Sequence, residues 1–239
     1  MSSGVILSAT SLLLSMLWIV TCYNATSDME TETQQRLRFR AVAFLFCWLL
    51  FVGFLGYSGI LSNFTMLPPP FFLFITLIFV TAIMLGFSKL GKALIDTYDL
   101  NFLVGFQCFR VLAEWALMQA YHEGIAPLQM TWEGLNLDLL SGISAFFFLF
   151  WKRAPVWIIT VWNIVAFALL INVVAIGMLS APTPFRIFLE GPSIVWVTYF
   201  PYILLPGVLV FAALLGHVLL FRALFRVNTL LPLDGEAGT

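Results

Sequence analysis

The sequence predicts an all-α protein that crosses a membrane seven times, and three observations support this fold class. Of its 239 residues, 62% are hydrophobic and only 10% are charged, whereas soluble domains average about 45–50% apolar and about 25% charged residues. The apolar residues form runs near the length of about 20 residues that a membrane-spanning helix needs. The basic residues are distributed so that they select one orientation. We therefore expect a polytopic bundle of seven transmembrane helices, with the N terminus outside and the C terminus inside.

The composition also limits the classes of partner. The formal net charge is −1 and no basic run stands in a polar context, which argues against nucleic-acid binding. The three cysteines, Cys22, Cys47 and Cys108, lie in or beside apolar runs without CxxC spacing. We interpret them as small buried hydrophobic residues rather than as disulfides or metal ligands. The expected surroundings are a lipid bilayer, with no cofactor and with residues 1–239 forming a single transmembrane domain.

Seven apolar runs account for the seven predicted helices. They are approximately Val5–Tyr23, Ala41–Ser62, Pro70–Ser88, Phe102–His122, Leu137–Trp151, Ala154–Leu179 and Val195–Phe225. The first run lacks the basic leader and the small-residue cleavage site of a signal peptide, so we expect it to remain as a span. The fifth run has about 15 residues, roughly 22 Å of helix against a hydrocarbon core of about 30 Å. Its outer end, with Asn136 and Asp138, is expected to dip into the membrane or to face a water-filled cavity.

The basic residues give the orientation, because Lys and Arg are retained on the cytoplasmic side of a membrane. With the N terminus outside, nine of the 11 basic residues fall inside: Arg36, Arg38, Arg40, Lys89, Lys92, Lys152, Arg153, Arg222 and Arg226. Only Arg186 falls outside, and Arg110 lies within a span. The opposite orientation would place those nine basic residues outside and only Arg186 inside. The chain is therefore expected to be a multi-pass membrane protein with its C terminus on the cytoplasmic side.

Prolines mark the seventh predicted helix. Pro182 and Pro184 precede it, where the first-turn amides need no helical partner. Pro201 and Pro206 fall inside it and are expected to kink it. A kink frees backbone carbonyls, which neighbouring groups must then satisfy.

Polar residues are concentrated between residues 106 and 138. An ionisable group at the centre of a membrane helix costs roughly 2.5–3.5 kcal/mol on insertion scales, so such groups usually mark function. The helical period places five of these residues on one stripe or at its edge: Gln107, Arg110, Glu114, Tyr121 and His122. Arg110 and Glu114 stand at i and i+4 near the middle of the span, which is close enough for an ion pair. Such a pair either fixes helix packing or belongs to a functional site.

The following segment, residues 125–138, continues this polar region and should fold back over the bundle because it carries several apolar residues. Thr131, Asn136 and Asp138 are all able to cap the fifth helix, but capping accounts for only one or two of them. Asn163 on the sixth helix lies at a depth similar to that of Arg110. The candidate ligand-binding residues are Gln107, Arg110, Glu114, Tyr121, His122, Thr131, Glu133, Asn136, Asp138 and Asn163.

A metal site in the same region would need three or four ligands within reach of one another. A histidine–carboxylate set is available in His122, Glu123, Glu133 and Asp138. The other histidine, His217, is placed near the inner end of the predicted seventh helix, far from His122. This separation argues against bis-histidine haem and against a two-histidine zinc site. We therefore expect no metal, and we interpret His217 as a packing or interfacial residue.

The motif of this region resembles an uncharacterised group of bacterial seven-helix inner-membrane proteins. The similarity runs through Arg110-x3-Glu114, His122, Pro127-x2-Met130-Thr131-x-Glu133-Gly134-x-Asn136-x-Asp138, Pro182-x-Pro184-Phe185, Tyr199-Phe200-Pro201 and His217. It covers roughly the second half of the chain. The group has no assigned activity, so the resemblance implies a bacterial inner-membrane setting and emphasises these residues without implying a reaction.

Two functions from different classes remain open. In the first, the protein binds or transports a small solute, with Arg110 holding a polar or anionic group or with Glu114 exchanging a proton. In the second, it is a membrane-embedded enzyme or a subunit of a membrane complex, with Glu114, His122 or Asp138 acting as acid, base or ligand. The sequence favours the first reading, and it leaves the solute and the oligomeric state undetermined.

Overall fold

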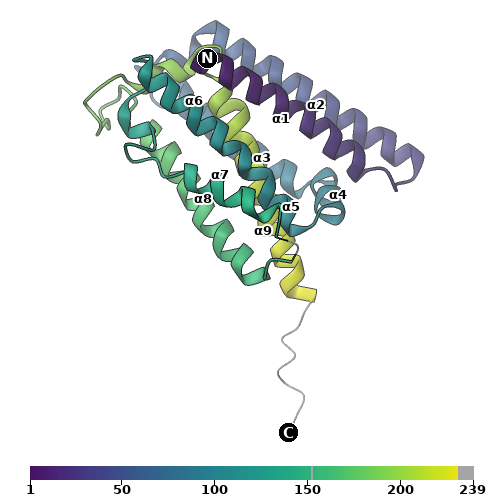
Figure 1. Ribbon diagram of the computed structural model, residues 1–239. Helices are drawn as coiled ribbons and strands as arrows, with labels where there is room; N and C mark the ends of the chain where they lie inside the picture. Colours follow the sequence, from purple (N-terminus) through teal and green to yellow (C-terminus); the bar gives the residue numbers. More distant parts are fainter. Residues whose placement is uncertain (152, 231–239) are drawn as a thin grey trace.

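A computed structural model of the chain describes residues 1–151 and 153–230, and every regular element in them is helical (Figure 1). The α-helices are α1 (Ser3–Ala25), α2 (Thr31–Ser58), α3 (Pro70–Phe87), α4 (Lys89–Thr97), α5 (Leu100–Gly105), α6 (Arg110–His122), α7 (Leu139–Phe148), α8 (Val156–Leu179) and α9 (Phe211–Leu230). Between them lie the short 3-10 helices η1 (Ile60–Ser62), η2 (Phe106–Phe109), η3 (Leu128–Met130) and η4 (Ile194–Thr198), and the π-helical segment η5 (Leu205–Val210).

Within the described residues, six helical segments are long and apolar enough to cross a membrane. They are Ser3–Ala25, Thr31–Ser58, Pro70–Phe87, Leu100–His122, Val156–Leu179 and Leu205–Val227. They correspond to six of the seven predicted spans, and the all-α class is confirmed. The predicted fifth span, Leu137–Trp151, is instead the ten-residue helix α7. At 1.5 Å per residue α7 is only about 15 Å long, about half the thickness of a hydrocarbon core.

Helix α2 begins about ten residues before the predicted start at Ala41. The arginine-bearing segment is helical as well, and Arg36 forms an exposed ion pair with Glu32 one turn earlier, at 2.6 Å. The helix ends at Ser58 because Gly59 adopts the left-handed conformation, with φ +69°, that commonly terminates helices. Lys152, also assigned to the inner side, lies outside the described residues.

The last span begins ten residues later than the predicted start at Val195. Residues 199–203 form a bend and turns, so Pro201 precedes the helix and the prediction that it kinks the helix interior is wrong. The distortion lies instead in η5, whose π-helical turn carries Pro206 near its start. The Trp48 indole Nε1 donates a hydrogen bond to the Gly207 carbonyl at 2.7 Å. A neighbouring group thus satisfies a carbonyl of the distorted turn, as membrane burial requires.

The interior is organised around α9, which packs against α3, α4, α5 and α8, while α1 packs against α6. Small residues set the closest approaches, as in other membrane bundles. A Cβ added at Gly142 of α7 would lie 2.7 Å from the Val111 backbone nitrogen. The absence of a side chain at Gly142 therefore brings α7 directly against the start of α6. This contact places Asp138, one turn before Gly142, beside Arg110, the residue before Val111.

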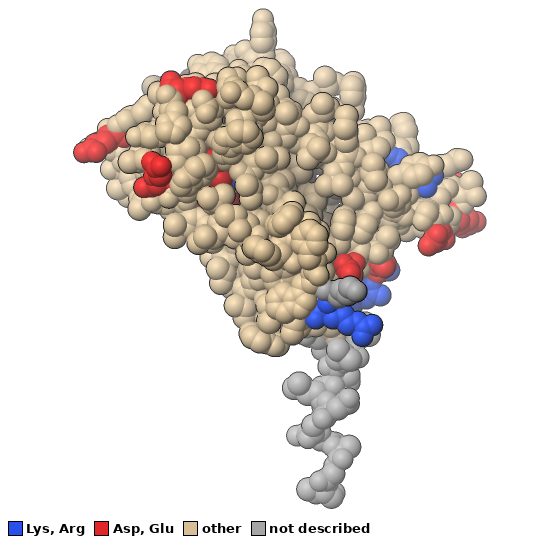
Figure 2. Space-filling model, in the orientation of Figure 1, with Lys and Arg blue, Asp and Glu red and all other residues tan. Residues whose placement is uncertain are grey.

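The two ends of the molecule differ in charge. The N terminus lies beside the end of α6, where the Ser3 amide donates to Glu123 at 3.0 Å, and the C-terminal end of α9 lies at the opposite end (Figure 1). On the face seen in Figure 2, charged side chains gather at the ends and the surface between them is almost free of charge. Lys92 and Arg226 both bind Asp96 near the C-terminal end of α9.

Candidate functional site

The centre of the site is a buried ion pair between α6 and the start of α7. The guanidinium of Arg110 is 1% exposed, and the Asp138 side chain is almost as deeply buried. Arg110 Nε donates to Asp138 Oδ2 at 2.7 Å, and Nη2 donates to Oδ1. Two parallel charge-assisted bonds of this kind are stronger and more directional than a single bond. Arg110 lies near the middle of the 23-residue run Leu100–His122, so this pair sits at the depth where an unpaired charge would be most costly.

The remaining donors of Arg110 are also occupied. Nη2 donates to the Ala166 carbonyl of α8 at 3.1 Å, and Nη1 lies 3.0 Å from His217 Nε2 on α9. With the two bonds to Asp138, these contacts account for four of the five N–H groups that a guanidinium carries. Arg110 therefore joins α6, α7, α8 and α9 at one point.

This arrangement fixes the tautomer of His217. Arginine can only donate, so His217 Nε2 must accept and cannot carry a hydrogen. The ring is therefore neutral and carries its hydrogen on Nδ1, which lies 2.7 Å from Asn163 Oδ1 and donates to it. Both His217 and Asn163 are fully buried. Hydrogen bonds thus run without a break from Asp138 through Arg110 and His217 to Asn163.

The second carboxyl of the site, Glu114, has a different environment. It is 2% exposed, and the Asn136 amide Nδ2 donates to its two oxygens at 2.9 and 2.8 Å. The same amide donates to the Met130 carbonyl, while Asn136 Oδ1 accepts from the Asp138 backbone N–H. Among the described residues no salt bridge involves Glu114. The expected ion pair between Arg110 and Glu114 is therefore wrong, because Asp138 takes that role.

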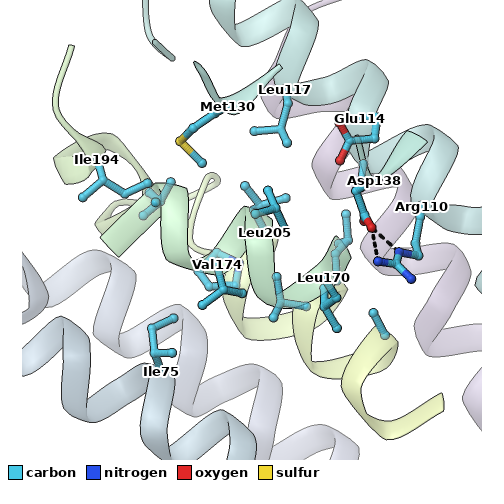
Figure 3. A pocket seen from close by; sticks show the side chains of 18 of the residues that line it. Ile75, Arg110, Glu114, Leu117, Met130, Asp138, Leu170, Val174, Ile194 and Leu205 are labelled. Atoms are coloured by element: carbon cyan, nitrogen blue, oxygen red, sulfur yellow. Dashed lines mark hydrogen bonds and ion pairs between the residues drawn. The ribbon is translucent and has the colours of Figure 1, made fainter. Parts of the chain in front are cut away.

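An apolar cavity of about 70 Å³ lies against this polar cluster. Its walls come from α3, α6, α8, η4 and η5, and its charged lining residues are Arg110, Glu114 and Asp138. Figure 3 shows these three side chains together on one side of the cavity, with Leu117, Met130, Ile194, Val174 and other apolar side chains around the rest. The half-buried members of the wall are Val173, Val174, Met178 and Val210. The accessible side of the cavity therefore lies between α8 and the start of α9.

The structure brings together five of the ten predicted site residues: Arg110, Glu114, Asn136, Asp138 and Asn163. The segment 125–138 folds back against the bundle, as expected, and buries Met130, Asn136 and Asp138. Asp138 directly precedes α7 but makes no side-chain cap, because its carboxylate binds Arg110.

The other five predicted residues lie apart from this cluster. Buried Gln107 donates from Nε2 to the Ala213 carbonyl at 3.0 Å, and the buried Thr131 hydroxyl donates to the Leu128 carbonyl at 2.9 Å. Both side chains therefore donate to backbone carbonyls rather than to the ion pair. Tyr121 is half-buried at the end of α6, and His122 and Glu133 are exposed. In the described part of the chain, no three His, Cys, Asp or Glu side chains are grouped so that they could hold a metal ion.

His217 is the member of this cluster that the sequence does not predict. It was placed near the inner end of a helix that was expected to start at Val195. The span actually runs from Leu205 to Val227, which puts His217 near its middle, at the depth of Arg110. An ionisable residue within a long apolar run was the available signal.

In comparisons with known proteins, no family model, no curated protein and no solved structure matches the chain.

Proposed function

We propose that the chain is a multi-pass inner-membrane protein that binds or transports a small solute in the cavity beside Arg110, Asp138 and Glu114. The observation that carries this proposal is the position of three ionisable side chains in the wall of an otherwise apolar cavity at mid-span. Ligand pockets are typically apolar with a few convergent polar groups. Ionisable residues at this depth are costly and usually mark a substrate or ion pathway.

The proposed topology has seven membrane segments, with the N terminus outside. Helix α7 and the infolded segment 125–138 together complete the fifth crossing, because α7 alone is too short. The arrangement of charge supports the orientation: α4 and the C-terminal part of α9, which carry Lys89, Lys92, Arg222 and Arg226, lie toward one end of the bundle, whereas the end of α6, with Glu123, lies toward the other (Figure 1). Basic residues are retained on the cytoplasmic side. The resemblance to bacterial seven-helix proteins agrees with this setting.

Cysteine labelling tests the topology. In a variant with Cys22, Cys47 and Cys108 replaced by alanine, single cysteines are introduced at the exposed positions Ser27 and Glu133. A membrane-impermeant maleimide added to intact cells should label Glu133→Cys and should label Ser27→Cys only after permeabilisation. Labelling of both from outside, or the reverse pattern, would contradict the proposed orientation.

The cavity itself is tested by filling it. A Cβ at Gly177 would lie 3.3 Å from Ile194 Cδ1 and 3.8 Å from Met130 Cε, both in the cavity wall. Gly177→Leu therefore adds bulk inside the cavity. Gly53→Leu is the matched control, because a Cβ at Gly53 meets nothing within 4 Å.

The readout is native mass spectrometry of the detergent-purified protein. We expect a retained small-molecule adduct in the wild type and in Gly53→Leu, and its loss in Gly177→Leu. Val174→Phe, which narrows the accessible side of the cavity, is the second variant if Gly177→Leu does not fold. An adduct that survives both cavity variants would place the ligand elsewhere and contradict the proposal.

A further inference from the structure

We propose that the solute is a small organic cation, a primary amine with a hydrocarbon body, whose ammonium group binds Glu114. This inference rests on the proposed function and specifies the chemical class of the ligand. It follows from which charges in the cavity wall are already neutralised and which are not.

Arg110 is not available to hold an anion. Its guanidinium makes two bonds to Asp138 and one each to Ala166 and His217, so all three of its nitrogens are engaged. An anionic ligand would have to displace the Asp138 carboxylate and leave it buried without a partner. Breaking a buried ion pair in this way typically costs about 3–5 kcal/mol. The expectation that Arg110 holds an anionic group therefore does not fit the geometry.

Among the three ionisable side chains of the cavity wall, Glu114 is the one without an oppositely charged partner. With Glu114 ionised against a bound cation, the cluster carries one positive charge on Arg110 and two negative charges on Asp138 and Glu114, because His217 is held as the neutral ring. The two oxygens of Glu114 accept only from Asn136 Nδ2 among the described residues. A carboxylate offers about four acceptor positions. A bound ammonium would therefore find free acceptor positions at Glu114 and would balance the second carboxylate of the cavity wall.

The rest of the wall determines the body of the ligand. Apart from the three ionisable side chains, the lining residues are apolar, and they reach from Arg110 at mid-span to Gly177 and Ile194 near the outer ends of their elements. A hydrocarbon chain is therefore favoured over a polar body. Glu114, which would bind the ammonium, lies eight residues before His122 at the end of α6, which is about 12 Å along a helix. That depth favours a free amine over the headgroup of a bilayer lipid, which stays at the interface.

The test compares three probes with the same eight-carbon chain and different head groups: octylamine, octanoate and 1-octanol. At pH 7 an alkylamine is cationic, as lysine is with its pKa of about 10.4, and a carboxylic acid is anionic. Binding to the full-length purified protein is measured by isothermal titration calorimetry and by the shift in thermal midpoint. We expect octylamine to bind the wild type at least tenfold more tightly than octanoate, with 1-octanol intermediate.

Variants connect this preference to Glu114. Glu114→Gln should weaken octylamine binding at least tenfold and leave 1-octanol binding within about twofold, whereas Glu190→Gln, at an exposed loop position, should change neither. Glu114→Asp, which keeps the charge, should retain the preference for octylamine. If Glu114→Gln does not fold, the comparison of probes on the wild type remains decisive.

The outcomes separate this inference from the proposed function. Equal or tighter binding of octanoate, or octylamine binding that is unchanged in Glu114→Gln, would overturn the cation assignment. If that binding is still lost in Gly177→Leu, the solute cavity stands. If none of the three probes binds the wild type, both the cation assignment and the proposed cavity function are overturned.

Discussion

Arg110 and Asp138 are 28 residues apart in the sequence, yet the guanidinium of one lies in the fork of the carboxylate of the other. This relationship explains why α7 begins at Leu139, level with the middle of the preceding span, and is only ten residues long. Asp138, the residue before α7, carries a charge that needs a buried partner. That partner, Arg110, lies near the middle of the preceding span. The short length of α7 and the infolding of the segment before it therefore both follow from the ion pair between Arg110 and Asp138.

Asn136 should be the residue on which this infolded segment depends most. Its side chain binds Glu114, the Met130 carbonyl and the Asp138 amide, all of them buried. Asn136→Leu leaves these groups without a partner, and each unsatisfied buried group costs about 1–3 kcal/mol. We expect a clear fall in the thermal midpoint of the purified protein. Asn172→Leu, which removes one bond to the Leu135 carbonyl at a more exposed position, is the control and should have a smaller effect. Equal effects of the two changes would contradict this role.

The tautomer of His217 is a second prediction. Because Arg110 donates to Nε2, the hydrogen must lie on Nδ1. Nitrogen-15 NMR of protein labelled at histidine should show an unprotonated Nε2 and a protonated Nδ1 for this residue at pH 7. His122→Ala removes the signal of the other, exposed histidine and so completes the assignment. A spectrum of the imidazolium or of the Nε2–H form would show that Arg110 does not bind the ring as described.

The N-terminal anchor of α1 should depend on pH. Partial burial of Glu123 opposes its ionisation, but hydrogen bonds from the Ser3 hydroxyl and amide outweigh this effect and hold the pKa of Glu123 below its ordinary value. A lowered pKa in the folded state stabilises the protein above the unfolded value of about 4.3, and this stabilisation is lost as the pH falls through the folded value.

Hydrogen exchange at the first turn of α1 measures this effect. Protection should be constant between pH 7 and about 5, after correction for the intrinsic rate, and should fall at lower pH. Glu123→Gln should have reduced protection at pH 7 and little further change on acidification. Identical pH profiles for the wild type and Glu123→Gln would show that the contact with Ser3 does not anchor the helix.

The sequence predicted most of the fold because hydrophobicity and charge act locally along the chain. Four of the seven predicted spans were located to within about two residues at each end, among them Ser3–Ala25 and Pro70–Phe87. The errors fell where local composition did not decide the structure. Arg36, Arg38 and Arg40 did not prevent α2 from extending beyond the apolar run, because arginine is a good helix former. The apolar residues 195–204 fold as a 3-10 helix and turns, although their hydropathy fits a span.

The site was predicted less well, for a physical reason. Spacing along α6 identified Arg110 and Glu114 as neighbours on one helix, and a local ion pair was the simplest inference. The actual partner of Arg110 depends on the close approach of α7 at Gly142, a tertiary contact that no local pattern encodes. His217 was misjudged because its depth depends on where the last span begins. The sequence therefore identified most of the polar residues of the site, but it did not identify the residues with which they form hydrogen bonds and ion pairs.

A double-mutant cycle on Arg110 and Asp138 tests the central claim most directly. Arg110→Met and Asp138→Leu, each alone, should destabilise the protein by about 3–5 kcal/mol, because each leaves a buried charge without its partner. The double variant should lose much less than the sum, because two apolar groups can replace a buried pair. The exposed pair of Glu32 and Arg36 is the control and should show almost no coupling.

The measurement is the thermal midpoint of the four purified proteins in one detergent. Strongly non-additive losses, with the double variant more stable than either single variant, are the result that a buried pair in the membrane predicts. If neither single variant lowers the thermal midpoint, or if the two losses simply add, Arg110 and Asp138 do not bind each other. The ion pair would then be absent from the cavity wall.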